Sequence, residues 1–207
     1  MVYSREQDDD VLTFLHSGKL WQDALVLVDE ESGSLWSQAT GEAIAGEKTG
    51  RVLASIPSVM TTWERWLAGH PDTLVLPSDH QRRRLKMRLY PRMEGMLGIL
   101  GTDNPDPRLA GKTVIAGFNG AADPVAVHFP AGNDAQAAQL HIDGAAVIVE
   151  KAGNDGPIRV WRSSGPPAWR KIEQIPAATM YWFVWSALNP GSEIVAAQAR
   201  PREAAPK

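Results

Sequence analysis

The sequence predicts a mainly β protein, in which antiparallel, meandering sheets form two tandem duplicated units, each with a short tryptophan-bearing helix. Two observations lead to this prediction. Short runs of β-branched and aliphatic residues follow one another along the chain, separated by Asn-Gly and Asp-Gly dipeptides that favour tight hairpins. A pattern of rare residues also recurs at a fixed interval, which is typical of a duplicated structural unit.

The recurring pattern begins at an Ile-Pro dipeptide and contains two tryptophans three residues apart. Ile56-Pro57 is followed by Trp63, Trp66, Ala68 and Pro71, and Ile175-Pro176 is followed by Trp182, Trp185, Ala187 and Pro190, without a gap in any interval. Tryptophans at i and i+3 lie on one face of a helix, and the proline ends it. We expect each helix to cover one side of its own sheet.

The ends of these helices also have sequence signals. Thr61 and Glu64 have the spacing of a capping box, which would begin the first helix. The residue before each terminal proline is polar, His70 in the first copy and Asn189 in the second. We expect both side chains to form a hydrogen bond near the helix C-terminus.

Eight strands are expected from the β-branched and aliphatic runs. They cover residues 11–15, 24–28, 51–56, 73–76, 113–118, 125–129, 145–150 and 158–161. Asn119-Gly120, Asp143-Gly144 and Asp155-Gly156 are the expected tight turns, since such dipeptides accept positive φ angles.

Four regions follow from the repeat and from changes in composition. They are a first repeat unit at 1–78, a basic and proline-rich connector at 79–111, a second repeat unit at 112–199 and a disordered tail at 200–207. Residues 2–14 resemble the hairpin 147–161 in character, but only the second unit has a long stretch before it. We therefore expect a first unit that is incomplete at its N-terminus, with an unpaired strand edge in 2–14 through which the chain self-associates.

The composition excludes several classes of function. The chain has 207 residues, a net charge of −3 and no cysteine, so disulfides, thiolate metal sites and cysteine nucleophiles are absent from it. The weak negative charge predicts no nucleic-acid partner. We expect no membrane span, because the longest uncharged run is interrupted by two prolines, and no signal peptide, because the first ten residues are polar. Compartment and cofactors stay undetermined.

The densest set of polar residues lies between Leu15 and Glu42, where tryptophans are interspersed among them. The candidate ligand-binding residues are His16, Ser17, Lys19, Asp29, Ser34, Trp36, Gln38 and Glu42. A carboxylate near an imidazole can perform acid–base chemistry, and an indole can stack on a ligand. The same residues could instead cap turns and satisfy buried backbone groups. No metal site is predicted, since the five histidines lack the spacing of metal ligands.

Several short motifs match a known family. They are Ser17-Gly18-Lys19-Leu20, Leu25 to Asp29, Gly33 to Gln38, Gly41 to Gly46, Thr62-Trp63 and His70 to Thr73, with weaker agreement at Asp106 to Lys112 and Trp182 to Pro190. Through these residues most of the chain, and most specifically its first half, resembles an uncharacterised bacterial and archaeal family, the domain of unknown function 3179. Members usually carry an upstream Cys-Pro-x-Cys-like motif that this chain lacks, so thiol chemistry does not transfer to it. The resemblance implies that export from the cytoplasm is an option, and it implies no particular activity.

Two functional hypotheses remain. The first is a non-catalytic ligand-binding or assembly module. The alternative is a metal-dependent or redox enzyme whose reactive residues lie partly in a missing N-terminal segment. The lack of cysteine and of any recognised catalytic spacing favours the first hypothesis.

Overall fold

A computed structural model describes residues 1–76, 97, 105–119, 123–132, 135–153 and 156–199. Within these residues the protein is mainly β with two short helices, which confirms the predicted fold class. Most of the expected connector, the expected tail and the Asn119-Gly120 and Asp155-Gly156 turns lie wholly or partly outside the described residues. No described helix combines the length and the apolar character that crossing a membrane requires.

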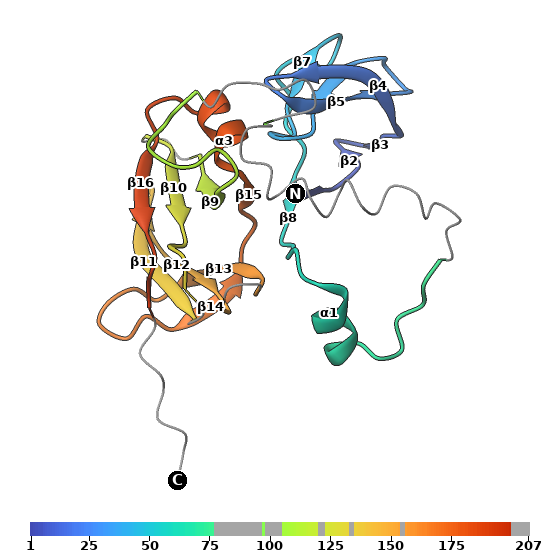
Figure 1. The fold of residues 1–207 in the computed structure, drawn as a ribbon. Helices are drawn as coiled ribbons and strands as arrows, with labels where there is room; N and C mark the ends of the chain where they lie inside the picture. Colours follow the sequence, from blue (N-terminus) through green and yellow to red (C-terminus); the bar gives the residue numbers. More distant parts are fainter. Residues whose placement is uncertain (77–96, 98–104, 120–122, 133–134, 154–155, 200–207) are drawn as a thin grey trace.

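The N-terminal part contains a four-stranded antiparallel sheet and two small strand pairs (Figure 1). The sheet has the order β4 (Phe14–Trp21), β5 (Ala24–Asp29), β6 (Leu35–Ser37) and β7 (Ala43–Ala45). The pairs are β1 (Val2–Tyr3) with β8 (Ser55–Ile56), and β2 (Glu6–Gln7) with β3 (Asp10–Val11). The side chains of Leu12, Trp36, Ala43 and Leu53 form a small core under this sheet.

Three expectations for this part are wrong. Residues 2–14 do not form one hairpin, because Val2–Tyr3 pairs with Ser55–Ile56, whereas self-association through an edge in this stretch stays a prediction. The expected strand 51–56 is reduced to its last two residues and a single bridge between Glu42 and Val52. Residues 73–76 form no strand, since no described strand pairs with them, and Leu74 and Leu76 are 95% and 91% exposed.

The C-terminal part packs two larger sheets face to face (Figure 1). One has the order β15 (Ala178–Tyr181), β9 (Val114–Phe118), β10 (Val125–His128) and β16 (Glu193–Ala196). The other has the order β14 (Lys171–Gln174), β13 (Ile158–Ser163), β12 (Ala145–Lys151), β11 (Gln136–Ile142) and β17 (Gln198–Ala199). Ala116 and Val127 from the first sheet meet Val147, Val149 and Val160 from the second in one core. Burial of these β-branched side chains is the main stabilising term for such a pair of sheets.

Turn chemistry explains the hairpins. Asp143 and Gly144 have φ angles of 49° and 78° between β11 and β12, as predicted for a tight turn. The turn between β4 and β5 uses Gln22 and Asp23 with φ angles of 48° and 60°, which the sequence did not indicate. Among the described strands one pairing departs from the antiparallel pattern: β10 and β16 are parallel, because the chain crosses the sheet through a helix before β16.

The two helices are α1 (Trp63–Gly69) and α3 (Trp182–Leu188), at the two predicted places. The N-cap of α1 is Thr62, whose side chain accepts from Arg65 N, so the expected capping box at Thr61 is one residue out. Helix α3 covers its sheet, as expected. Helix α1 buries none of its residues, so the expectation that it too covers a sheet is wrong.

Candidate functional site

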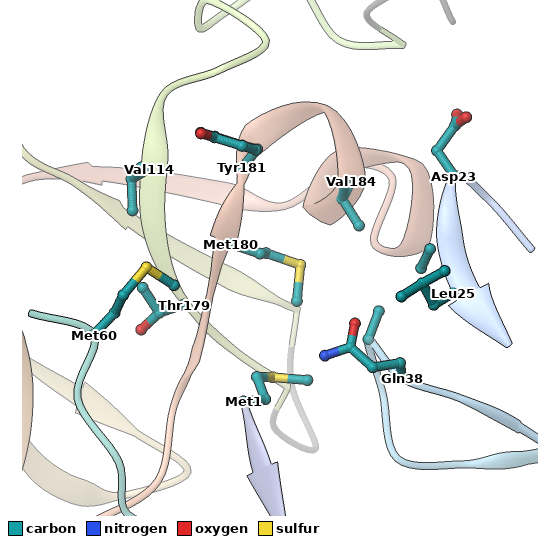
Figure 2. A pocket seen from close by; sticks show the side chains of 12 residues that line it. Met1, Asp23, Leu25, Gln38, Met60, Val114, Thr179, Met180, Tyr181 and Val184 are labelled. Carbon is teal, nitrogen blue, oxygen red and sulfur yellow. The ribbon is translucent and has the colours of Figure 1, made fainter. Parts of the chain in front are cut away.

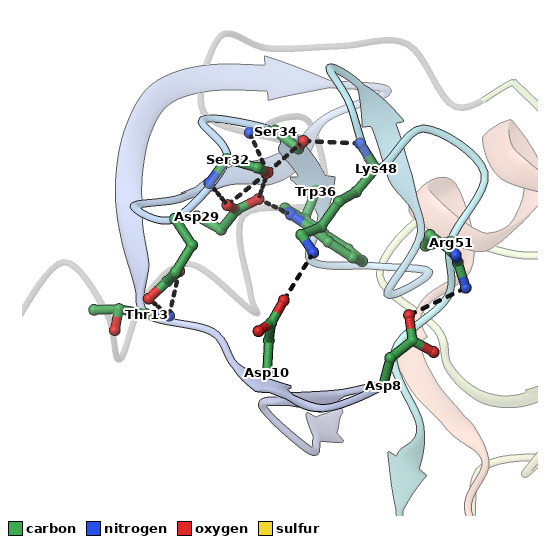
Figure 3. Close-up of polar contacts among 10 residues, drawn as sticks. Asp8, Asp10, Thr13, Asp29, Ser32, Ser34, Trp36, Lys48 and Arg51 are labelled. Carbon is green, nitrogen blue, oxygen red and sulfur yellow. Dashed lines mark hydrogen bonds and ion pairs between the residues drawn. The ribbon is translucent and has the colours of Figure 1, made fainter.

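The predicted polar set is only partly brought together. Asp29, at the end of β5, is fully buried, and Trp36 Nε1 donates to its Oδ2 atom at 2.7 Å (Figure 3). Ser32, in the turn between β5 and β6, donates to the same carboxylate from its hydroxyl, 2.7 Å from Oδ1, and from its backbone N–H. The hydroxyl of Ser34 lies 2.7 Å from that of Ser32 and accepts from Lys48 N at 3.1 Å. Every polar group of the cluster therefore has a protein partner.

The electrostatics of Asp29 fit this network. Desolvation of the buried carboxylate raises its pKa, but hydrogen bonds from Trp36 and Ser32 and the charge of Lys48 together outweigh it. The pKa of Asp29 therefore lies below its ordinary value, and the group is an anion at neutral pH. A saturated anion of this kind holds a turn well but is a poor proton acceptor for a substrate.

The second half of the chain contains a similar acid–indole pair. Trp161 on β13 donates from Nε1 to Glu150 Oε1 at 2.8 Å. Trp161 faces Ile148 across the strands and Glu150 lies two residues further along β12, just as Trp36 faces Leu27 and Asp29 lies two residues further along β5. The same diagonal contact in both sheets is explained by strand packing.

The remaining candidates do not join the Asp29 cluster. Ser17 lies at a bulge between His16 and Lys19, where its hydroxyl donates to Val26 O at 2.5 Å. His16 and Lys19 are exposed on the edge strand β4. Glu42 is exposed beside its bridge to Val52, and Gln38 lines a separate cleft.

Two members of the cluster were missed by sequence reasoning. Ser32 lies three residues after Asp29, the spacing at which a capping aspartate accepts from a backbone N–H, and this signal could have identified it. Lys48 comes from a distant turn and has no local signal; its Nζ lies 3.6 Å from Asp10 Oδ2. Among the residues that the structure describes, no group of three or more His, Asp and Glu side chains is placed to hold a metal ion.

A cleft of about 320 Å³ lies between the first sheet and β15 (Figure 2). Leu25 and Gln38 border it on one side and Met180 and Tyr181 on the other, with Met1 nearby. Its lining is mostly apolar, and it contains no converging set of charged groups. Such a lining can accommodate an apolar group but offers no acid–base pair.

The largest difference between the two halves is at the helices. Trp182 and Trp185 of α3 are 0% and 1% exposed, whereas Trp63 and Trp66 of α1 are 52% and 38% exposed. We call Trp63, Trp66 and Leu67 the α1 face. Leu67 is also 38% exposed, and the nearby Met60 is 75% exposed. Groups of exposed large apolar side chains are common at interaction sites of folded proteins.

The α1 face is nonetheless held in the same local geometry as its buried counterpart. Trp66 Nε1 donates to Thr73 Oγ1 at 2.9 Å, and Trp185 Nε1 donates to Ser192 Oγ at 3.0 Å. These hydroxyls in turn donate to the carbonyl oxygens of the residues that end the helices, at 2.8 Å and 2.7 Å.

The predicted hydrogen bonds at the helix ends are present in both copies. His70 Nδ1 lies 3.1 Å from Trp66 O, and Asn189 Nδ2 donates to Trp185 O at 3.2 Å. The agreement of the two helix ends supports a duplication. For the complete units, duplication stays a prediction.

Comparison with known proteins gives one match. The family model described as "Protein of unknown function (DUF3179)" matches residues 1–192. No curated protein and no solved structure matches the chain.

Proposed function

Because the chain belongs to the DUF3179 family, whose function is unknown, we propose a function from its own geometry: a non-catalytic assembly module that binds a protein partner through the α1 face. The observation that carries this proposal is the contrast in exposure between the tryptophans of α1 and those of α3. Two indoles in one helix, ordered but each more than a third exposed, are typical of the aromatic anchors on which protein interfaces depend.

The polar cluster supports the non-catalytic part of the proposal. Asp29 accepts hydrogen bonds from Ser32 and Trp36 and is fully buried, which suits a structural role for Asp29, Ser34 and Trp36. His16 and Lys19, which could supply a proton or a charge, lie outside this network on an edge strand. Asp29, Ser34 and Trp36 thus stabilise the four-stranded sheet of the N-terminal part.

The repeated helix offers a matched test of the binding surface. We expect Trp63→Ala with Trp66→Ala to change the free energy of unfolding by less than about 1 kcal/mol, since neither side chain is buried. Trp182→Ala with Trp185→Ala should cost at least about 3–5 kcal/mol, because each leaves a cavity in a packed core. Urea denaturation followed by circular dichroism measures the free energy of unfolding of both double variants.

Binding of an apolar dye gives a second readout. The wild-type protein should bind anilinonaphthalene sulfonate, and the Trp63→Ala, Trp66→Ala variant should bind less of it. If the two double variants lose similar stability, the α1 face is part of the folded core and the proposed function is wrong.

A further inference from the structure

We infer that the partner supplies a two-stranded antiparallel β-hairpin, which packs under the α1 face as β9 and β10 pack under α3. The hairpin also pairs through its outer edges with residues 59–62 and 74–76, and so completes a four-stranded sheet. This inference rests on the proposed function and specifies the partner.

The surroundings of α3 show how such a helix is seated. Strand β15 leads into α3 and pairs with β9, whereas β16 follows α3 and pairs with β10 (Figure 1). The hairpin β9–β10 thus lies between the two strands that flank the helix. The indoles of Trp182 and Trp185 pack on Ile115 and Ala126 of that hairpin.

Helix α1 has the same flanking segments without the hairpin. Thr62 precedes α1 in extended conformation (φ −75°, ψ 153°), as Tyr181 precedes α3 (φ −73°, ψ 146°). Thr73 takes the place of Ser192, which leads directly into β16. In the described part of the chain, residues 59–62 and 74–76 pair with no strand. Thr62 O accepts from Trp66 N at 3.0 Å, but the other backbone groups of these segments are available to pair with an added strand on each side.

The apolar character of these segments fits a sheet that is not yet assembled. Met60 is 75% exposed, Val75 is 64% exposed, and Leu74 and Leu76 are almost fully exposed. The counterpart of Val75 in the second half, Ile194, packs against the α3 cluster. A hairpin inserted between the two segments would cover the α1 indoles and bring both edges into hydrogen bonding at once.

The contact between Trp185 and β9 indicates which residues the partner hairpin must contain. A Cβ atom on Gly117 of β9 would lie 2.3 Å from the Trp185 ring, so only glycine fits beneath that indole. The matching hairpin needs a glycine under Trp66, with small or branched apolar residues on either side. A preceding loop must also offer a carbonyl to Trp63, as Asp106 O accepts from Trp182 Nε1 at 2.7 Å.

A second copy of this chain is a poor source of the hairpin. Its own β9–β10 hairpin is already covered by its α3, whose tryptophans are fully buried. Helix α1 of one copy would have to displace α3 of the other, and this exchange uncovers as much indole surface as it covers. The inferred occupant is therefore a hairpin that has no helix of its own.

The test uses the full chain with a second copy of residues 105–131 fused ahead of Met1 through a flexible Gly-Ser linker. Hydrogen–deuterium exchange is measured by mass spectrometry for peptides within 58–76. We expect exchange there to slow by at least about tenfold relative to the unfused protein, because strand pairing protects backbone amides. The matched control carries Gly117→Leu in the added copy only, which should abolish the protection.

Engineered cysteines provide a second readout, since the chain contains none. Thr179 pairs with Ala116 in the second half, and Met60 is the counterpart of Thr179. Met60→Cys with Ala116→Cys in the added copy should form a disulfide on oxidation. Met60→Cys with Val114→Cys in the added copy should form less disulfide, because this pair is two residues out of register.

The outcomes separate the two proposals. If the fusion neither protects 58–76 nor forms the in-register disulfide, while Trp63 and Trp66 remain dispensable for stability, the hairpin inference is overturned and the assembly role stands. If residues 58–76 are already protected in the dilute unfused protein, both are overturned. Protection that rises with the concentration of the unfused chain would identify a second copy as the occupant and overturn the hairpin inference.

Discussion

Asp29 illustrates, at the scale of single residues, how a carboxylate can look catalytic in a sequence and be structural in the fold. Its side chain accepts from Trp36 on the neighbouring strand and from Ser32 in the turn. These bonds and the charge of Lys48 lower its pKa in spite of the desolvation that opposes them. The ionised form therefore stabilises the folded state.

The pH dependence of stability tests this role. Because the folded-state pKa of Asp29 is below its ordinary value of 3.8, its contribution is fully present above that pH and is lost as the pH falls through the folded-state pKa. We expect Asp29→Asn to cost about 1.5–3 kcal/mol at pH 7. The difference from wild type should narrow below pH 3.8, as measured by urea denaturation at several pH values.

Glu42→Gln is the matched control, since this carboxylate is exposed on the same sheet. It should leave the free energy of unfolding unchanged. A difference between Asp29→Asn and wild type that stays constant down to pH 2 would show that ionisation of Asp29 does not stabilise the fold.

The packing of α3 on β9 is the decisive contact at the scale of elements. Gly117 allows the Trp185 ring to approach the strand directly, and Trp185 in turn donates to Ser192 at the start of β16. One glycine thus sets the distance between the helix and the sheet. Helix α1 has the matching hydrogen bond from Trp66 to Thr73 but buries none of its residues.

Substitution of Gly117 should therefore destabilise the second half. We expect Gly117→Val to cost about 1–3 kcal/mol or more, because the added side chain overlaps the Trp185 ring. Gly132→Ala is a suitable control, since its Cβ would lie 3.6 Å from the Gln136 amide, an ordinary contact. The melting temperatures of the two variants, measured by thermal unfolding, test this expectation. Equal melting temperatures for the two variants would contradict the close packing of Trp185 on β9.

The whole molecule contains separate cores in its two halves. The first is built around Leu12 and Trp36, and the second around Val127 and Val149 between the two larger sheets. The cleft between Leu25 and Met180 lies between the halves (Figure 2). We propose that the two predicted units, 1–78 and 112–199, are independently stable regions.

Independent stability has a direct consequence for amide exchange. Val149→Ala should speed exchange in β11, β12 and β13, since it removes two methyl groups from the core of that half. Exchange in β4, β5 and β6 should not change. Trp36→Phe should instead speed amide exchange in β4, β5 and β6 and leave exchange in β11, β12 and β13 unchanged. If either substitution speeds exchange in both halves, the molecule unfolds as one unit.

The sequence by itself determined the β class, the positions of both helices and the hydrogen bonds at their C-termini. These features depend on local patterns: β-branched runs, Asp143-Gly144 in its turn, and tryptophans at helical spacing ended by proline. It also located Asp29, Ser34 and Trp36, because a polar set interleaved with indoles is visible in one dimension.

Only the tertiary structure decided which of the repeated elements are buried. Residues 73–76 have the composition of a strand, yet they form none, because strand formation requires a partner that composition does not supply. Lys48 reaches the Asp29 cluster from a turn far along the chain, and Trp66 remains exposed although its counterpart in α3, Trp185, is buried. Burial depends on what lies opposite a side chain, and that is a property of the assembled sheets.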